Sequence, residues 1–132
     1  MNRAECPREE DIVRALCDSH FDKTHNRFSS YVFVGPNTSV SRLLILPLNE
    51  LFKIFHRDLD KPQKSKVIAS GEINVGKLQD IGKNHNEPQA ITVKIDPFPE
   101  NKAHAIIPQK LSRSLAKKII RELRFHASPQ SA

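Results

Sequence analysis

The sequence predicts a single small α+β domain, with about three helices and a mainly antiparallel sheet of four to five strands. Apolar residues recur at helical spacing in some segments and alternate or cluster in shorter ones, which indicates both helices and strands. No glycine-rich turn joins a strand to a helix, so we expect neighbouring strands to pair as hairpins. With 132 residues and 38% hydrophobic content, the chain can form one core. We therefore expect one basic domain over residues 1–132, with flexible ends at 1–6 and 126–132.

Helices are expected in three main segments and a short fourth. The first begins at Pro7, which suits a first helical turn, and the second follows Pro47. The C-terminal helix has the clearest periodicity, with Leu115, Ile119 and Leu123 on one face. The expected helices cover residues 7–18, 48–59, 75–81 (the short one) and 112–125.

Strand-forming residues mark five segments between these helices. They are rich in β-branched and aromatic residues and end at turn-forming Gly, Pro, Asn or Asp. The first two flank Gly35-Pro-Asn-Thr38 and are therefore expected to form a hairpin. The expected strands cover residues 31–34, 40–46, 67–73, 90–95 and 103–107.

The positive charge of the chain lies in its second half. The net charge is +6, and residues 61–132 hold thirteen Lys or Arg against six Asp or Glu, whereas residues 1–60 hold eight against nine. Such an asymmetry can reflect an acidic partner, nucleic acid first. Many bacterial cytosolic domains are equally basic without binding nucleic acid, which is the alternative.

Four cations share one face of the C-terminal helix. On an ideal helix, Arg113, Lys117, Arg121 and Arg124 fall within about 80° of one another, away from the apolar face. Such a stripe could follow a phosphate backbone, with Lys110 and Arg42 as further candidate anion-binding residues. The alternative is a solvated helix face, because no aromatic residue is interleaved to stack on bases.

His104 is the candidate catalytic residue. It is flanked by alanines on an expected strand and shares its face with Ile106. Histidine as a residue type suits a general base, because its ordinary pKa lies near neutrality. A phosphate-directed enzyme would combine it with Arg27 and Ser30, whose guanidinium and hydroxyl suit phosphate. The alternative is a packed strand histidine with one hydrogen bond.

The sequence contains no recognisable metal, cofactor or membrane motif. The histidines lack ligand spacing, and Cys6 and Cys17 match neither a zinc site nor a disulfide framework, so we expect no metal and no cofactor. Both cysteines are expected to be reduced, with Cys17 facing the core and Cys6 exposed. No apolar run reaches membrane-spanning length, and the N-terminus lacks a signal-peptide core, so we expect a cytoplasmic protein without a membrane partner.

Three short elements resemble those of a group of small, uncharacterised bacterial proteins. They are Arg27-Phe-Ser-Ser-Tyr-Val-Phe33, Ser39-Val-Ser-Arg42 and Pro99-Glu-Asn-Lys-Ala-His-Ala105, which match an order of Arg-x-Ser-Ser, Ser-Val-x-Arg and Asn-x-Ala-His-Ala. The resemblance covers roughly residues 27–120. It implies a bacterial origin and brings no known activity.

Three functions follow as hypotheses from these observations. The first is a binding or accessory domain that contacts nucleic acid or another anionic partner through its C-terminal half. The second is a small nuclease-like or transferase-like enzyme built on His104 with Arg27 and Ser30. The third is a protein-interaction subunit of a bacterial defence or toxin-antitoxin assembly.

Overall fold

A six-stranded antiparallel sheet is the centre of the fold. The computed structural model describes residues 3–129, and within them it confirms a small α+β fold with three α-helices and a mainly antiparallel sheet. The strands are β1 (Asp11–Cys17), β2 (Phe21–Asp22), β3 (Arg27–Phe28), β4 (Thr38–Arg42), β5 (Val67–Asn74), β6 (Lys94–Ile95), β7 (His104–Ile107) and β8 (Arg124–Ala127). The helices are α1 (Leu48–Leu59), α2 (Val75–Asn84) and α3 (Arg113–Glu122), with 3₁₀-helices η1 (Asp18–His20) and η2 (Ser30–Phe33).

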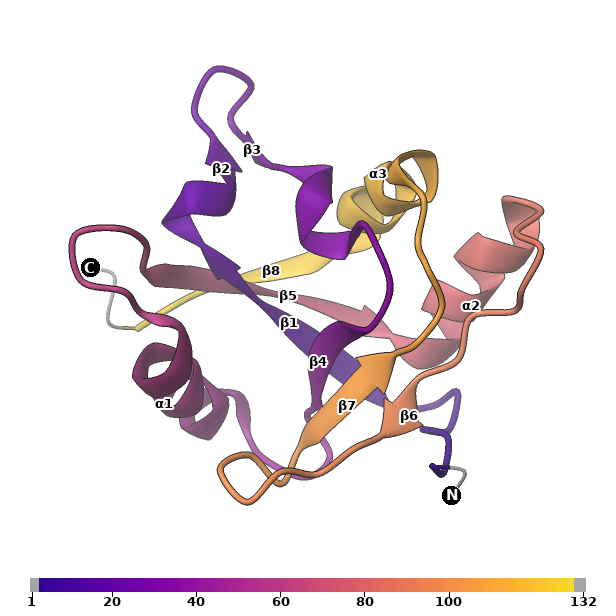
Figure 1. Ribbon diagram of the computed structural model, residues 1–132, viewed down its shortest axis with the longest axis horizontal. Coiled ribbons are helices and arrows are strands. Elements are labelled where there is room, and N and C mark those ends of the chain that lie inside the picture. The colour runs from indigo at the N-terminus through magenta and orange to yellow at the C-terminus, as the bar shows by residue number, and fades with distance from the viewer. Residues whose placement is uncertain (1–2, 130–132) are drawn as a thin grey trace.

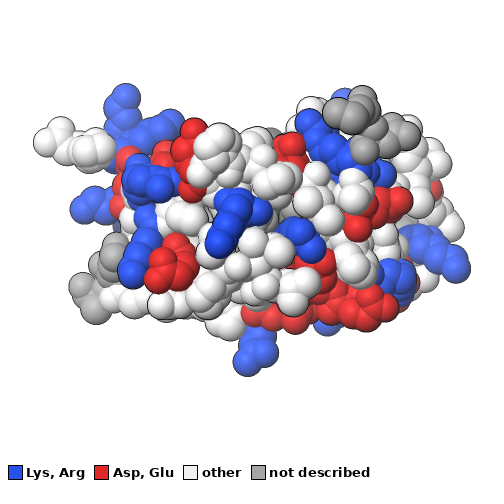
Figure 2. Space-filling view, turned by 90° about the horizontal axis from the view of Figure 1, so that it is seen from below, with Lys and Arg blue, Asp and Glu red and all other residues white. Residues whose placement is uncertain are grey.

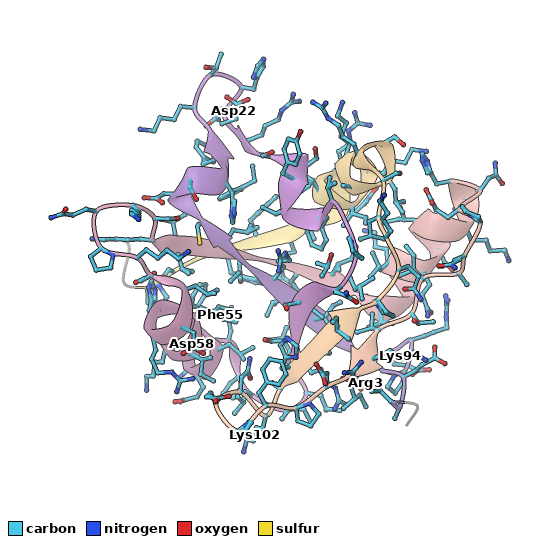
Figure 3. All side chains as sticks on the ribbon, in the orientation of Figure 1. Arg3, Asp22, Phe55, Asp58, Lys94 and Lys102 are labelled. Atoms are coloured by element: carbon cyan, nitrogen blue, oxygen red, sulfur yellow. The ribbon has the colours of Figure 1, made fainter. Side chains whose placement is uncertain are left out.

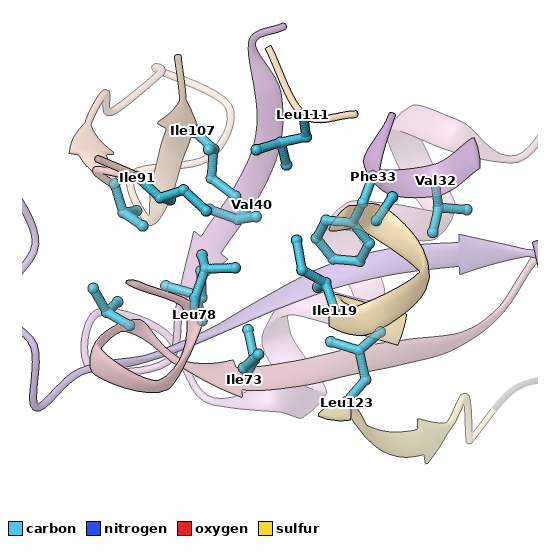
Figure 4. Close-up of a cluster of buried hydrophobic side chains, with 14 of the residues drawn as sticks. Val32, Phe33, Val40, Ile73, Leu78, Ile91, Ile107, Leu111, Ile119 and Leu123 are labelled. Carbon is cyan, nitrogen blue, oxygen red and sulfur yellow. The ribbon is translucent and has the colours of Figure 1, made fainter. Parts of the chain in front are cut away.

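The strand order of the main sheet is β6-β7-β4-β1-β5-β8, and β2 and β3 form a separate small hairpin (Figure 1). One face of the sheet packs against α2, α3 and η2 (Figure 4). In this larger core, Leu78 of α2, Ile119 of α3 and Phe33 of η2 meet apolar residues of the strands. Leu51, Phe52 and Phe55 of α1 cover the opposite face. The sheet is thus the middle layer of the molecule.

The segment 7–18, expected to be a helix, contains the central strand β1, so that prediction is wrong. β1 pairs with β4 on one side and β5 on the other, and both of its faces are buried. Ile12 and Leu16 point into the larger core, whereas Val13 and Cys17 point towards α1. A strand buried on both faces has apolar residues at odd and even positions, and here they also fit a helical stripe.

The hairpin expected from 31–34 and 40–46 does not form. Residues 30–33 are the 3₁₀-helix η2, in which the Ser29 hydroxyl accepts a hydrogen bond from the main-chain N–H of Tyr31 at 3.2 Å. β4 pairs instead with β1 and β7, and it ends at Arg42, before a turn leads into α1. Val32 and Phe33 are apolar because they are buried in the larger core, which explains the misleading strand composition.

The remaining elements agree with the sequence more closely. The helix after Pro47, the strand over 67–73, the short helix from residue 75 and the strand at 103–107 are all present. Only Lys94–Ile95 of the segment 90–95 is a strand. The C-terminal helix ends at Glu122, and Arg124 begins the edge strand β8, which pairs with β5.

Parts of both expected flexible ends are described. The main-chain carbonyl of Ala4 accepts a hydrogen bond from Ile95 at 2.7 Å, and the N–H of Cys6 donates to Val93 at 2.7 Å. Residues 124–127 form β8, whereas residues 1–2 and 130–132 lie outside the described residues. Cys6 is buried in the larger core, so its expected exposure is wrong. Cys17 is buried near α1, as predicted, and both thiols are free.

Candidate nucleic-acid interface

The structure brings Arg27 and Ser30 together with three cations of α3. Arg27, Ser29, Ser30, Arg113, Lys117 and Arg121 line a hollow of about 350 Å³, which we call the α3 groove. Its lining comes from β3, η2 and α3, of which η2 and α3 are in contact. β3 and α3 lie at the top of Figure 1.

Local sequence positions each wall of the α3 groove. Asp22 ends β2, and its Oδ1 accepts hydrogen bonds from the main-chain N–H groups of Thr24 and His25 at 3.0 and 3.3 Å. These bonds stabilise the tight turn that leads to Arg27. On the other wall, the Ser112 hydroxyl caps α3 by accepting a hydrogen bond from Leu115 N–H at 3.2 Å.

The packing of α3 decides which of its side chains reach the groove. Leu115, Ala116 and Ile119 are buried in the core, and Arg113, Lys117 and Arg121 are exposed on the other side of the helix. The stripe predicted from helical periodicity is therefore present for these three cations. Arg124 is not part of it, because it lies in β8.

The cations of the groove outnumber its acidic residues, although Asp22 stands opposite Arg27 in the β2–β3 register. Within residues 3–129, none of Arg27, Arg113, Lys117 and Arg121 forms a salt bridge. Asp22 is the one acidic residue of the lining, and its Oδ2 lies 2.6 Å from His25 Nδ1. Hydrogen bonding by the His25 ring lowers the pKa of Asp22 below its ordinary value. The groove thus keeps a surplus of positive charge for an external anion.

Aromatic rings lie beside this charge. Tyr31 is 66% exposed, and the guanidinium carbon of Arg113 lies 5.8 Å from the centre of its ring. Phe28 of the groove stacks on Phe125 of β8, with 5.6 Å between ring centres, and Phe125 is itself 47% exposed. Reasoning from the sequence missed these rings, because Tyr31 reaches Arg113 from a segment distant in the chain, and Phe125, which follows α3 closely, meets Phe28 from the equally distant β3.

Other predicted site residues lie elsewhere. Arg42 donates two hydrogen bonds to the buried Glu10 carboxylate, at 2.8 and 2.7 Å, which raise the pKa of Arg42 and neutralise its charge. Lys110 lines a separate hollow near Leu111, and Arg124 stands opposite Glu72 in the register of β8 and β5. On the face of the molecule that Figure 2 shows, positive and negative side chains are interspersed. In the lining of the α3 groove, by contrast, the cations outnumber the acidic residues.

His104 does not join Arg27 and Ser30. It begins β7 opposite Ser41 of β4, is 7% exposed, and lines a different cavity, which has no lining residue in common with the α3 groove. The trio proposed for a phosphate-directed enzyme is therefore divided between two cavities.

Neither a metal centre nor a membrane span is found in the described part of the chain. No three His, Cys, Asp or Glu side chains of residues 3–129 gather in a way that could hold a metal ion. No helix among these residues has the length and apolar character that crossing a membrane requires.

Comparison of the chain with protein-family models, with curated proteins and with solved structures gave no match.

Proposed function

We propose that this protein binds single-stranded nucleic acid through the α3 groove. The observation that carries the proposal is the convergence on one hollow of four cations that form no salt bridge within residues 3–129, namely Arg27, Arg113, Lys117 and Arg121. Cations that already form internal ion pairs lose part of their attraction for phosphate, and these four have none within residues 3–129. Binding would release counterions condensed on the nucleic acid, which favours association at low salt.

The chemistry of the lining suits phosphate. Guanidinium groups present paired N–H donors to phosphate oxygens, and three of the four cations are arginines. The hydroxyls of Ser29 and Ser30 line the same hollow and add hydrogen-bonding groups beside the charge. A hollow of about 350 Å³ is of the size of one nucleotide rather than of a duplex.

The aromatic rings favour a single strand over a duplex. Bases of a single strand can turn outward and stack on exposed rings, whereas bases of a duplex already stack on one another. Tyr31 lies beside Arg113, so one nucleotide can place its phosphate on the guanidinium and its base on the ring. Phe125, which stacks on Phe28 of the groove, is a second exposed ring on which a base can stack.

The test is charge reversal inside and outside the α3 groove. Binding of a fluorescent single-stranded oligonucleotide is measured by anisotropy over a range of salt concentrations. In the double variant Lys117→Glu with Arg121→Glu, we expect weaker binding and a salt slope that is reduced by about 0.7 for each lost phosphate contact. Both side chains are exposed and face away from the core, so the fold should persist.

The matched control changes the same total charge elsewhere. Lys64→Glu with Lys102→Glu replaces two exposed lysines outside the α3 groove. This control should retain most of the binding and the wild-type salt slope. If both double variants lose binding equally, attraction depends on net charge alone and the groove is not the site. Absence of binding by the wild type at low salt contradicts the proposal directly.

A further inference from the structure

A second cavity lies on the face of the sheet that α1 covers. It has a volume of about 700 Å³, and we call it the α1 pocket. Phe55 and Leu59 of α1 and Phe98 of the segment before β7 contribute apolar lining, and Asp58 of α1 also lines the pocket. Figure 3 shows Phe55 and Asp58 on this helix. Ser39, Ser41 and His104 of the sheet, together with Asn101, contribute polar groups to the lining. Arg14, Arg57 and Glu100 contribute further charged groups.

The α1 pocket follows from the way β1 and β4 separate. The two strands are paired beside Val13 and Ser41, and the register does not continue to Ala15 and Ser39. Ala15 and Ser39 are short, so they leave space where the strands diverge. Ser39 is an exposed residue and lines the pocket.

His104 contacts Ser39 through one ring nitrogen and Asp96 through the other, so the three residues form a connected series beside the α1 pocket. His104 Nε2 lies 3.2 Å from Ser39 Oγ. His104 Nδ1 lies 2.9 Å from the main-chain oxygen of Asp96 and 3.3 Å from its Oδ2. Arg3 Nε binds the other carboxylate oxygen of Asp96 at 2.9 Å, and the His104 ring stacks on Phe98 with ring centres 3.9 Å apart. The imidazole is thus held by contacts at both nitrogens and on one ring face.

These contacts decide which nitrogen of neutral His104 carries the proton. A carbonyl oxygen only accepts hydrogen bonds, so Nδ1 must donate to the main-chain oxygen of Asp96. Nε2 is then the unprotonated nitrogen, and the Ser39 hydroxyl donates to it. A serine hydroxyl that donates to an oriented imidazole is the arrangement of an activated nucleophile.

Arg14 adds an unneutralised positive charge to the same pocket. Its Nε donates to the main-chain oxygen of Val32 at 2.6 Å, and its Nη1 donates to that of Ser39 at 2.8 Å. No carboxylate within residues 3–129 forms a salt bridge with Arg14. Burial removes water from the Arg14 guanidinium and lowers the pKa of Arg14. Negative charge that develops in the pocket would be stabilised by this guanidinium.

A second Ser-His-Asp series in the chain shows what distinguishes Ser39. His56 Nε2 lies 2.7 Å from Ser128 Oγ, and His56 Nδ1 lies 2.8 Å from Asp60 Oδ2. Both distances are shorter than those from His104 to Ser39 Oγ and to Asp96 Oδ2. Ser128 is only 4% exposed, however, and it does not line the α1 pocket. Both serines therefore have the hydrogen bond to histidine that a nucleophile needs, but only Ser39 lines a large cavity.

We propose that Ser39 is the nucleophile of an ester-hydrolysing site, with His104 as its general base and Asp96 as a positioning residue. Ser39 Oγ attacks the ester carbonyl carbon and gives its proton to His104 Nε2, and the alcohol leaves with that proton as its bond to carbon breaks. Water then attacks the acyl group on Ser39 and passes a proton to His104. The carboxylic acid departs as Ser39 regains its proton. Arg14 stabilises the oxygen that becomes negative in both steps.

The lining of the α1 pocket indicates the substrate class. Phe55, Leu59 and Phe98 form apolar walls, so an ester with an apolar acyl or alcohol group fits the cavity. The site is independent of the α3 groove, so Ser39→Ala should leave nucleic-acid binding unchanged. Failure of this proposal is therefore separable from failure of the proposed function.

The test uses an alkyl fluorophosphonate, which forms a phosphorus–oxygen bond to an activated serine with loss of fluoride. Intact mass and peptide mapping should find one adduct, on Ser39. Ser39→Ala should abolish this adduct, and His104→Gln should slow its formation by at least about 100-fold. Hydrolysis of p-nitrophenyl butyrate should fall in both variants.

The matched control is Ser128→Ala, which removes the serine of the buried series and should leave labelling of Ser39 unchanged. Folded wild-type protein should also react at least about 100-fold faster than urea-unfolded protein, a comparison that needs no variant to fold. Equal rates in the two states, an adduct on another serine, or full reactivity of folded His104→Gln would each overturn the proposal.

Discussion

Arg42 and Glu10 form a buried ion pair with two hydrogen bonds, between the end of β4 and the residue before β1. The two donor–acceptor distances are 2.8 and 2.7 Å, and the side chains are only 11% and 6% exposed. A carboxylate and a guanidinium so deeply buried are each tolerated because the other is present. The pair joins two neighbouring strands of the sheet and leaves Arg42 without free charge for a ligand.

Removing one partner of this pair should be costly. Arg42→Met leaves the Glu10 carboxylate buried and unpaired, so we expect the free energy of unfolding to fall by about 3–5 kcal/mol. Urea denaturation followed by circular dichroism measures the change. The matched control is Arg8→Met, because Arg8 also pairs with a carboxylate, with its Nη2 donating to both oxygens of Asp80, but does so at the surface. That variant should lose no more than about 1 kcal/mol, and equal losses would contradict the prediction.

The thiol of Cys6 should make stability depend on alkaline pH. Burial raises the pKa of Cys6 to about 11 from the ordinary 9.0, and the nearby Glu10 carboxylate adds to the rise. The unfolded chain therefore releases this proton first as the pH increases. Below pH 9.0 the contribution of Cys6 to stability is complete, and it is lost as the pH rises from there through about 11.

Urea denaturation of wild type and Cys6→Ala at several pH values between 8 and 11 checks this expectation. Cys17 also has a raised pKa, caused mainly by burial, but it is present in both proteins and acts as a common background. The wild type should lose stability more steeply with pH than the variant. Parallel curves would show that Cys6 titrates in the folded protein as it does in the unfolded chain.

The sequence predicts those elements whose apolar pattern has a single explanation. α1 buries Leu51, Phe52 and Phe55 on one side only, so its helical period is unambiguous. β1 is buried on both sides, and its apolar residues fit a helix as well as a strand. The fold class could be predicted in spite of this error, but the position of β1 between β4 and β5 could not, because strand order depends on pairing between distant segments.

The candidate sites were predictable only in part for the same reason. Helical spacing alone placed Arg113, Lys117 and Arg121 together. Nothing in the spacing joins Arg27 to them, because the contact between η2 and α3 is formed in three dimensions. The partners of His104 were likewise not predicted: Ser39 approaches it across the β4–β7 register.

Ser70 should be replaceable by alanine with a gain in stability. It is fully buried in β5, and its Oγ has no hydrogen-bond partner within residues 3–129. Because a buried hydroxyl without a partner is destabilising, Ser70→Ala should raise the free energy of unfolding by about 1 kcal/mol. The control is Ser41→Ala, since the Ser41 hydroxyl accepts a hydrogen bond from Asn101 at 3.1 Å and its loss should destabilise the protein. A drop in stability for Ser70→Ala would mean that the hydroxyl has a partner in solution.

Tyr31 should contribute to binding of a single strand without contributing to the fold. Its side chain is 66% exposed beside Arg113, so Tyr31→Ala should leave the free energy of unfolding almost unchanged. Loss of one base–aromatic stack should weaken binding of a single-stranded oligonucleotide by about 1–3 kcal/mol, and Tyr31→Phe should retain most of the affinity. Because no charge changes, the salt slope should equal that of the wild type.

Fluorescence anisotropy measures the affinity of each variant for a single strand and for the duplex of the same sequence. Leu44→Ala is the matched control, because Leu44 is another exposed large side chain and lies outside the α3 groove. The expected result is a loss of affinity confined to Tyr31→Ala and to the single strand, since the bases of the duplex are not free to stack on the ring. An equal loss for the duplex, or unchanged single-strand affinity, would show that Tyr31 does not stack on a base and that the α3 groove acts through charge alone.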